Sequence, residues 1–597
     1  MVLGAFMLLS IMTGVMIANM AAKSGGVPKL PDEMVLFLDL DQGLTERPQA
    51  KGFADQFGPS EPSVRDIVNM IDTATRDERV HGILARVEGG QFGMSHVYEV
   101  RAALKRFREA GKFTYIYSTS YGDAGGGLSL YYLASAFEQI WVQPMGIVAI
   151  TGMSAEMPFF RKVLDKIGVQ PQFFKRKDYK TAYENLTNEE MSAENREMMT
   201  RLVGDIREEI LKEIPADRGM GPAQFERLVH KGLFPAPEAL KAGLVTRVDY
   251  GDVLLGTIRE KMGYDRDSNE IGFFVNIPHY MAGLKHEKTE PGEAGHKARK
   301  PSVALVYAAG MIMPSGGRNA AAPVFMNSEV AAADEIGPAI TEAAEDKNIK
   351  AIVLRIDSPG GSPVASETIL HAVERAQNKG KKVIVSMGPV AASGGYWIAA
   401  YADRIFVTPT TLTGSIGVLG GKFATQDLSE KLGVSWDGVS WGENAGMWSV
   451  NTPFSESEAA RINVMLDQVY DGFLERVSKG RKMSIESVDK IAGGRVWTGK
   501  RAVEIGLADE IGGLENALDY VAQSLGQADR HALNVVIMPE PKTAIEKFLE
   551  LLEQQGEIGQ AVQWQMSIVE RLAPALEMMA VTGNRELYAT YEPLRLE

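Results

Sequence analysis

A serine flanked by small residues lies in the segment 388–396, which reads G-P-V-A-A-S-G-G-Y. The segment follows a run typical of a strand, 383–386, and leads into an apolar run typical of a helix, 396–402. Because the neighbours of Ser393 are alanines and glycines, its hydroxyl and the next backbone amides can face a substrate at the start of a helix. The pattern fits a nucleophile, and it fits equally well a tight turn that lets a helix pack close to a sheet.

Attack by a serine hydroxyl needs a base that accepts its proton, and the usual base is histidine. The chain has eight histidines, and none lies between His371 and His531. A lysine can take this role when burial keeps it neutral near the working pH. Lys180, in the segment D-Y-K-T-A-Y-E-N, is a candidate because Tyr179, Thr181 and Ala182 give it a partly apolar setting. A lysine in a charged loop is, however, usually a solvated lysine.

The segment 357–362, D-S-P-G-G-S, offers backbone amides for the same chemistry. Its two glycines leave these amides unobstructed, and such amides can hold the negative oxygen that develops on an attacked acyl group, typically at about 3 kcal/mol per donor. A β-turn with Pro359 at its second position explains the segment as well. Because ligands bind at the carboxyl ends of parallel strands, two Gly-Gly loops after successive strands favour a site.

The elements around these loops alternate between strand and helix. Residues 351–356 and 404–407 are short apolar runs typical of buried strands, and 366–379 is a helical pattern stopped by Gly380. Ser455 with Glu458, three residues later, predicts a capping-box start for a further helix. Strands that alternate with helices indicate an α/β fold with parallel sheets and right-handed βαβ units.

The chain also resembles itself. Two pairs of segments match: 82–90 with 351–358, and 131–144 with 396–409. The first pair sets Arg86 against Arg355 and Glu88 against Asp357. We therefore interpret the chain as a tandem duplication.

The two copies carry different chemistry. The position of Ser393 is Leu128 in the first copy, and the position of Ser415 is Ile150. Conversely, the position of Lys180 is Ala445 in the second copy. Each copy therefore holds what the other lacks, and whether Lys180 meets Ser393 of its own chain or of a neighbour is left open.

The 597 residues, with 45% hydrophobic content, are enough for more than one domain. The predicted division is a transmembrane signal anchor at 1–24, a first repeat at 30–285, a linker at 286–301, a second repeat at 302–540 and a helical tail at 541–597. The anchor is predicted because residues 1–22 carry no charged side chain and are long enough to span a bilayer. A cleaved signal peptide and a buried helix are the alternatives.

Composition excludes several classes of function. A net charge of −14 and a pI of about 5.3 disfavour nucleic acid as a partner. The chain has no cysteine, which rules out disulfides, thiolate metal sites and cysteine nucleophiles. No phosphate-binding loop or cluster of metal ligands stands out, so we expect neither cofactor nor metal.

Four motifs together identify a family: Y-K-T-A at 179–182, D-S-P-G-G-S at 357–362, A-S-G-G-Y at 392–396 and T-G-S-I-G at 413–417. Over about residues 30–540 the chain resembles the signal peptide peptidase A (protease IV) family, peptidase family S49. The resemblance implies a serine protease on a duplicated fold similar to crotonase and Clp protease. It assigns Ser393 as nucleophile, Lys180 as general base and Ser415 as the residue that orients the lysine. It also implies an oxyanion hole formed by the amides of Gly361 and Gly394, with Gly360 shaping the substrate-binding loop.

The resemblance extends to partners and location. It implies a homotetramer, held at the bacterial inner membrane by one pass with the catalytic part facing the periplasm. The expected substrates are cleaved signal peptides and other unfolded, apolar peptides. Two other functions stay open from the residues alone: an acyl-CoA hydratase or isomerase of the crotonase type, in which the same loops would hold an enolate, and a non-catalytic membrane scaffold.

Overall fold

The computed structural model describes residues 29–41, 43–48, 62–89, 92–122, 127–287, 300–315 and 330–540. The predicted anchor at 1–24, most of the predicted linker and the predicted tail at 541–597 lie outside these residues. Over the ranges that are described, no helix combines the length and the apolar character that a bilayer crossing needs.

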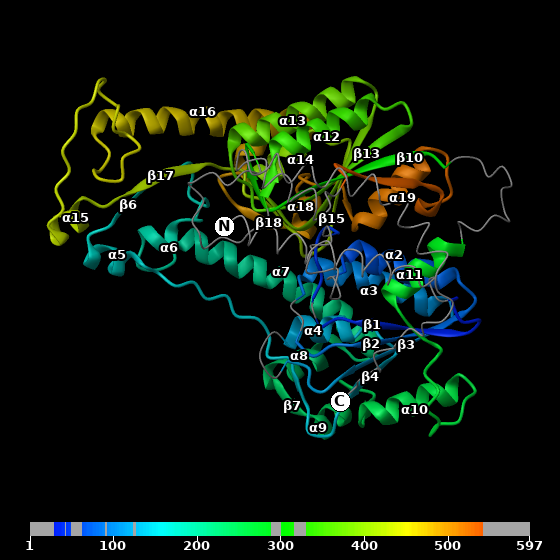
Figure 1. Cartoon of the computed structure of the whole chain (residues 1–597). Helices are drawn as coiled ribbons and strands as arrows, with labels where there is room; N and C mark the ends of the chain where they lie inside the picture. Colours follow the sequence, from blue (N-terminus) through cyan, green and yellow to red (C-terminus); the bar gives the residue numbers. More distant parts are fainter. Residues whose placement is uncertain are drawn as a thin grey trace, which may run out of the picture.

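The first half of the described chain forms a six-stranded parallel sheet in the order β8-β4-β3-β2-β1-β9 (Figure 1). Its elements are β1 (Met34–Asp39), α2 (Val64–Arg76), β2 (Val80–Arg86), α3 (Met94–Glu109), β3 (Phe113–Ser118), α4 (Gly127–Ala134), β4 (Gln139–Val142), β5 (Ile147–Ala149), α5 (Arg161–Ile167), β6 (Gln170–Lys175), α6 (Glu184–Thr187), α7 (Ala193–Arg218), α8 (Pro222–Lys231), β7 (Leu233–Pro235), α9 (Ala236–Lys241), β8 (Arg247–Val248), α10 (Gly251–Lys261), β9 (Phe274–Asn276) and α11 (Ile277–Glu287).

The second half repeats this plan around a sheet in which β20, β10, β13, β14, β15 and β19 are parallel neighbours. Its elements are β10 (Ser302–Ala309), β11 (Met311–Met313), β12 (Val330–Ala332), α12 (Ala333–Glu345), β13 (Ile349–Ser358), α13 (Pro363–Asn378), β14 (Lys382–Ala392), α14 (Gly394–Ala399), β15 (Arg404–Val407), β16 (Leu412–Gly414), β17 (Leu419–Ala424), α15 (Gln426–Leu432), α16 (Glu456–Arg481), α17 (Ile485–Ile491), β18 (Val496–Thr498), α18 (Gly499–Glu504), β19 (Glu510–Ile511), α19 (Leu514–Ser524) and β20 (Asn534–Met538).

The two sheets have the same strand order. Reading β9-β1-β2-β3-β4-β8 against β20-β10-β13-β14-β15-β19 pairs each strand with its counterpart in the other half. The predicted α/β class with parallel sheets is confirmed, and the common order agrees with a duplicated chain.

Strands buried on both faces explain why the sequence shows continuous apolar runs instead of alternation. In β10, Ala304 and Val306 belong to the core beneath α12, α13 and α14, whereas Val303 and Leu305 belong to the core beneath α19. In the first half, α10 occupies the position of α19 and packs its Leu254 and Ile258 onto the sheet.

Most of the predicted elements of the second half are confirmed. The run 404–407 is strand β15, 351–356 lies within β13, and 366–379 corresponds to α13. The predicted capping box of Ser455 and Glu458 opens α16.

Two predicted boundaries were wrong. The strand expected at 383–386 continues to Ala392, because a bulge absorbs Gly388 and Pro389 without ending the pairing with β13. The helix expected at 396–402 begins at Gly394 and ends at Ala399. The strand therefore ends one residue before Ser393, and the helix begins one residue after it.

The two halves interlock in two places. An arm built from β6, β17, α5 and α15 projects from both sheets, and in it β6 of the first half pairs antiparallel with β17 of the second (Figure 1). Helices α2 and α3 of the first half lie between its sheet and the second half (Figure 1).

Candidate active site

Ser393 lies at the sharp junction between β14 and α14. Its backbone has φ 54° and ψ −119°, a conformation that a non-glycine residue adopts only when the surrounding structure enforces it. The Ser393 N–H donates to the carbonyl of Gly414 on the neighbouring strand β16 at 2.9 Å. The side chain is therefore presented at the carboxyl end of a parallel strand, as in the strand-to-helix turns that carry nucleophiles in other hydrolases.

Lys180 comes from the first half and reaches the same place through the arm. Strand β6 pairs with β17 from Lys175 opposite Leu419 to Gln170 opposite Ala424, so the loop after β6 lies beside the segment before β17. Lys180 is 7% exposed. A Cβ at Gly417 would lie 3.3 Å from its Cδ, and one at Gly494 would lie 2.4 Å from its backbone nitrogen, so these glycines make room for it.

The Lys180 amine contacts both predicted serines. Its Nζ lies 3.0 Å from the Ser393 Oγ, 2.9 Å from the Ser415 Oγ and 2.9 Å from the Ser415 carbonyl oxygen. A neutral amine has two N–H donors and one lone pair. Donation of both N–H groups to Ser415 leaves the lone pair for the hydroxyl proton of Ser393. All three residues belong to one chain.

Burial sets the charge of this amine. It lowers the pKa of Lys180 to about 7, because the ammonium form has lost its hydration. A large fraction of the lysine is therefore neutral near physiological pH, and a neutral amine at 3.0 Å from a hydroxyl can accept its proton.

Two backbone amides, those of Gly361 and Gly394, lie close to the Ser393 residue. Ile312 makes the two backbone hydrogen bonds that hold the loop. Its N–H donates to the Gly360 carbonyl at 2.8 Å, and its carbonyl accepts from the Ser362 N–H at 2.9 Å. In this parallel bridge the Gly361 N–H points away from Ile312. The Gly394 N–H is the first of α14 and has no acceptor inside the helix. A Cβ at Gly394 would lie 3.1 Å from the Gly361 nitrogen, so the two amides are neighbours.

The loop needs glycine at both positions. Gly360 has φ 104°, and a Cβ there would lie 2.6 Å from the Gly394 nitrogen. Gly361 has φ 153°, and a Cβ there would lie 2.1 Å from the Ile312 carbonyl oxygen. The β-turn interpretation of 357–362 is therefore incomplete, because the glycines also let the loop approach Ser393.

All six residues that the sequence singled out lie together: Ser393, Lys180, Ser415, Gly360, Gly361 and Gly394. Sequence reasoning missed Gly417 and Gly494, which enclose the lysine stem. The adjacent pair Gly493 and Gly494 resembles the other two Gly-Gly loops and was the available signal.

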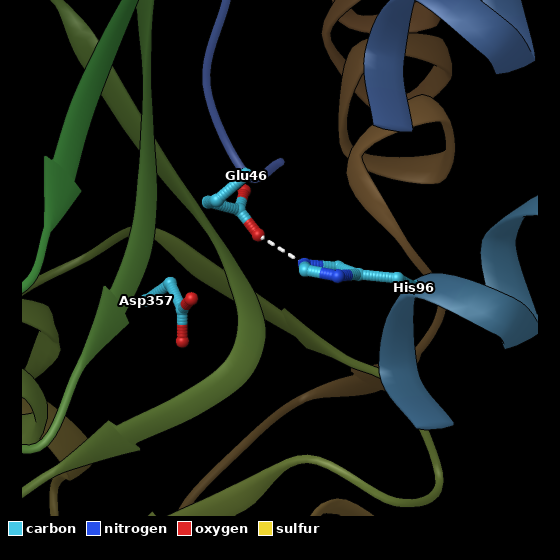
Figure 2. Close-up of side chains that lie close together, drawn as sticks. All are labelled: Glu46, His96 and Asp357. Atoms are coloured by element: carbon cyan, nitrogen blue, oxygen red, sulfur yellow. Dashed lines mark hydrogen bonds and ion pairs between the residues drawn. The ribbon is translucent and has the colours of Figure 1, made fainter. Parts of the chain in front are cut away.

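A group of buried charges, also missed, lies next to the loop. Carboxylate oxygens of Glu46 and Asp357 and a ring nitrogen of His96, which are atoms that could bind a metal ion, lie within 4.8 Å of one another (Figure 2). Arg355 donates to Glu46 at 2.5 and 3.2 Å, so the positive charge that a metal ion would bring is already supplied by a guanidinium. We therefore do not interpret this group as a metal centre.

A hydroxyl, a buried amine and two free amides at one point are the groups of an acyl-transfer site of the serine type. Residues 106–263 and 375–528 both match the model of peptidase family S49. The two matches begin 269 residues apart (106 against 375) and end 265 apart (263 against 528). Arg86 and Arg355 are also 269 residues apart, and Leu128 and Ser393 are also 265 apart. The two family matches therefore have the same offsets as the two copies compared in the sequence.

Relatives cover most of the chain. It is 32% identical over 537 residues to Protease 4 of Haemophilus influenzae, covering 86% of this chain and 83% of the relative. It is 31% identical over 543 residues to Protease 4 of Salmonella typhi, covering 88% and 83%. A shorter relative, the putative signal peptide peptidase SppA of Enterococcus faecium, is 39% identical over 175 residues, 29% of this chain and 51% of the relative.

The chain belongs to peptidase family S49, and it is a serine protease. This membership decides against the acyl-CoA hydratase and against the non-catalytic scaffold.

Proposed function

We propose that the protein cleaves peptides with a Ser-Lys dyad in which Ser393 is the nucleophile and Lys180 the general base. The observation that carries the proposal is the 3.0 Å contact between the Lys180 Nζ and the Ser393 Oγ, made by an amine whose burial keeps it partly neutral. Ser415 orients the amine, since both its oxygens accept hydrogen bonds from the Nζ.

The reaction follows from these positions. As the Ser393 Oγ attacks the peptide carbonyl carbon, its proton passes to the Lys180 lone pair, and the carbonyl electrons move to the oxygen. The amides of Gly361 and Gly394 donate to that oxyanion, while Gly360 keeps the loop close enough for both to reach it. The lysine then gives its proton to the leaving amine as the peptide C–N bond breaks, which leaves the acyl group as an ester on the Ser393 Oγ. In deacylation, the amine takes a proton from a water molecule that attacks the ester carbon, and the ammonium then gives this proton to the Ser393 Oγ as the ester C–O bond breaks.

The proposed substrates are cleaved signal peptides and other unfolded, apolar peptides. The name of the Enterococcus faecium relative supports this assignment. An extended peptide can pair with exposed backbone near the site and present small or apolar side chains to it. We place the protein at the bacterial inner membrane as a single-pass protein with the catalytic part in the periplasm, which the uncharged run 1–22 supports.

We also propose that copies of the chain assemble into a ring of four. The pairing of β6 with β17 supports this assembly. Carried through the duplication, the counterparts of β17 and β6 are residues 154–159 and 435–440, which form no strand within the described chain. Pairing of 435–440 with 154–159 of the next copy would repeat the contact between the halves. Val439 and Trp436, on one of these segments, are 105% and 63% exposed.

Two substitutions test the dyad. We expect Ser393→Ala and Lys180→Ala each to lower the turnover of a synthetic signal peptide by about 10³-fold or more, since each removes a group that the reaction needs. Lys177→Ala, on the same loop and in an exposed ion pair with Asp489 at 2.9 Å, is the matched control and should keep its activity. Wild-type turnover by either dyad variant, in folded protein, would refute the proposal.

A further inference from the structure

The strand that delivers Ser393 contains a bulge opposite the start of the glycine loop. Strands β13 and β14 pair Ile356 with Met387 and next pair Ser358 with Ala391, so three residues, 388–390, lie opposite Asp357 alone. A bulge leaves backbone groups without ladder partners and redirects the strand beyond it. Here the redirected strand ends at Ala392 and leads directly to Ser393, three residues after the bulge.

The side chain of Asp357 accepts a hydrogen bond from a backbone amide of the bulge. Its Oδ1 accepts a hydrogen bond from the Val390 N–H at 3.0 Å, and its carbonyl accepts from the Gly310 N–H at 2.8 Å. The other side of the bulge is held by Thr411, whose Oγ1 donates to the Gly388 carbonyl at 2.9 Å. Because Asp357 directly precedes the loop of Gly360 and Gly361, one carboxylate links that loop to the strand of Ser393.

The first half of the chain fills the space next to this carboxylate. Glu46 contacts the bulge so closely that a Cβ at Gly388 would lie 2.8 Å from its Oε2. The same oxygen lies 2.7 Å from the Nε2 of His96 on α3 (Figure 2). Glu46 and His96 are 9% and 7% exposed, so the contact between the halves is buried here.

Arg355 stabilises the negative charge of Glu46. Its guanidinium donates to Glu46 and, at 2.6 Å, to Glu99 of α3. Burial opposes ionisation of Glu46, but Arg355 and His96 outweigh it and lower the pKa of Glu46 to about 2. Burial and the neighbouring Glu46 charge raise the pKa of Asp357 to about 6. Glu46 is thus a fixed anion that Arg355 and His96 hold against the bulge.

We propose that Asp357, which lies next to Glu46 and His96 of the first half, is a positioning residue that sets the distance between the oxyanion loop and Ser393. The first half then serves the site twice, through Lys180 and through this buried contact. The proposal rests on the proposed role of Ser393, and it assigns to Asp357 an effect on turnover instead of on substrate binding.

The first copy contains a natural control. Glu88 is the counterpart of Asp357, and its Oε2 accepts from the Thr119 N–H at 3.0 Å, so it supports the equivalent loop. Thr119 directly follows β3, and the counterpart of Ser393 further along the chain is Leu128. Loss of the Glu88 contact therefore has a structural cost of the same kind, with no nucleophile to displace.

The experiment compares Asp357→Ala, Asp357→Asn and Glu88→Ala in the full chain. We expect Asp357→Ala to lower kcat roughly 10- to 100-fold, with KM changed less than about threefold, because a displaced nucleophile slows chemistry more than binding. Asp357→Asn should recover most of the loss, since its amide oxygen can still accept from Val390. Glu88→Ala should keep the wild-type kcat. Unfolding temperature, measured alongside, reports the structural cost of each change.

Wild-type kcat in folded Asp357→Ala, or an equal loss of kcat in Glu88→Ala, would overturn the proposal. If Asp357→Ala does not fold, Thr411→Val decides, because it keeps the shape and removes the hydrogen bond that holds the other side of the bulge; a folded Thr411→Val enzyme with wild-type kcat would count against us. Ser393→Ala separates the two proposals. Activity in that variant refutes the dyad, whereas its inactivity together with an unaffected Asp357→Ala refutes the positioning role alone.

Discussion

At the scale of single residues, the site depends on the number of hydrogen bonds that one amine can make. Lys180 has three oxygen neighbours, at 2.9, 2.9 and 3.0 Å, and the neutral form satisfies all three if Ser393 is the donor. The protonated form would make the same contacts, but it would have no lone pair for the serine proton. Activity should therefore follow the neutral fraction of this lysine.

The pH dependence of turnover tests this point. Lys180 must lose its proton to act as a base, so we expect kcat/KM to rise with pH and to level off above a midpoint near its pKa of about 7. The measurement uses a peptide substrate without titratable groups, between about pH 5 and 9. Ser415→Ala should lower the plateau because the amine loses one of its two orienting oxygens. A profile that falls between pH 6 and 8 would contradict a neutral lysine base.

At the scale of elements, the loop after β13 and the turn after β14 approach each other through glycines. The missing side chains allow Gly360 to contact Ser393 and allow Gly361 to lie against β11. The same close approach places the Gly361 and Gly394 amides side by side. We therefore propose that two loops that each look like an ordinary turn in the sequence form one anion-binding site where parallel strands end.

Gly361→Ala tests the importance of this approach. The new Cβ would lie 2.1 Å from the Ile312 carbonyl oxygen, so the loop must move and its amide with it. Loss of one oxyanion donor typically costs a factor of about 10² to 10³ in kcat, and we expect a loss of that size in peptide turnover.

Gly337→Ala is the control for this substitution. Gly337 lies inside α12, and a Cβ there would meet nothing closer than 4.0 Å. Alanine is also the better helix former, so activity should be unchanged and stability equal or slightly higher. Normal turnover by folded Gly361→Ala would exclude this amide from the site.

At the scale of the whole molecule, the two halves meet through buried charges as well as through the arm. Arg355 of the second half is bound by Glu46 and Glu99 of the first, and the Asp205 carboxylate on α7 accepts from Arg501 at 3.1 Å. Removal of one partner of such a buried pair is usually costly, so these contacts fix how the halves sit. Because Lys180 and Ser393 come from different halves, that arrangement decides whether a site exists.

The same duplication predicts how copies associate. We expect Val439→Asp and Trp436→Asp to break the ring into smaller species, because a charge would replace apolar surface in the proposed contact. Light scattering after gel filtration measures the mass. Turnover of a short peptide should persist, since the dyad lies within one chain. Ile485→Asp, at an exposed apolar position on α17, is the control and should not change the mass. A monomeric wild-type chain, or an unchanged mass in both variants, would exclude this assembly.

Much of the second half was predictable from local pattern. Short apolar runs gave β13 and β15, and one stop signal and one capping box gave α13 and the start of α16, because these features depend on neighbours a few residues apart. The boundary of β14 was not predictable. Gly388 and Pro389 look like the end of a strand, and only the partner strand and Asp357 show that pairing resumes after a bulge.

The sequence by itself determined the types of the reactive groups and the inequality of the two copies. Ser393, Ser415 and the glycine loops on one side, and Lys180 on the other, follow from residues compared position by position. Only the tertiary structure decided that the amine and the hydroxyl meet in one chain, that the amine is buried, and that Glu46 and His96 lie next to the glycine loop. The reason is physical: a pKa depends on burial and a distance depends on packing, and both are set by residues hundreds of positions away.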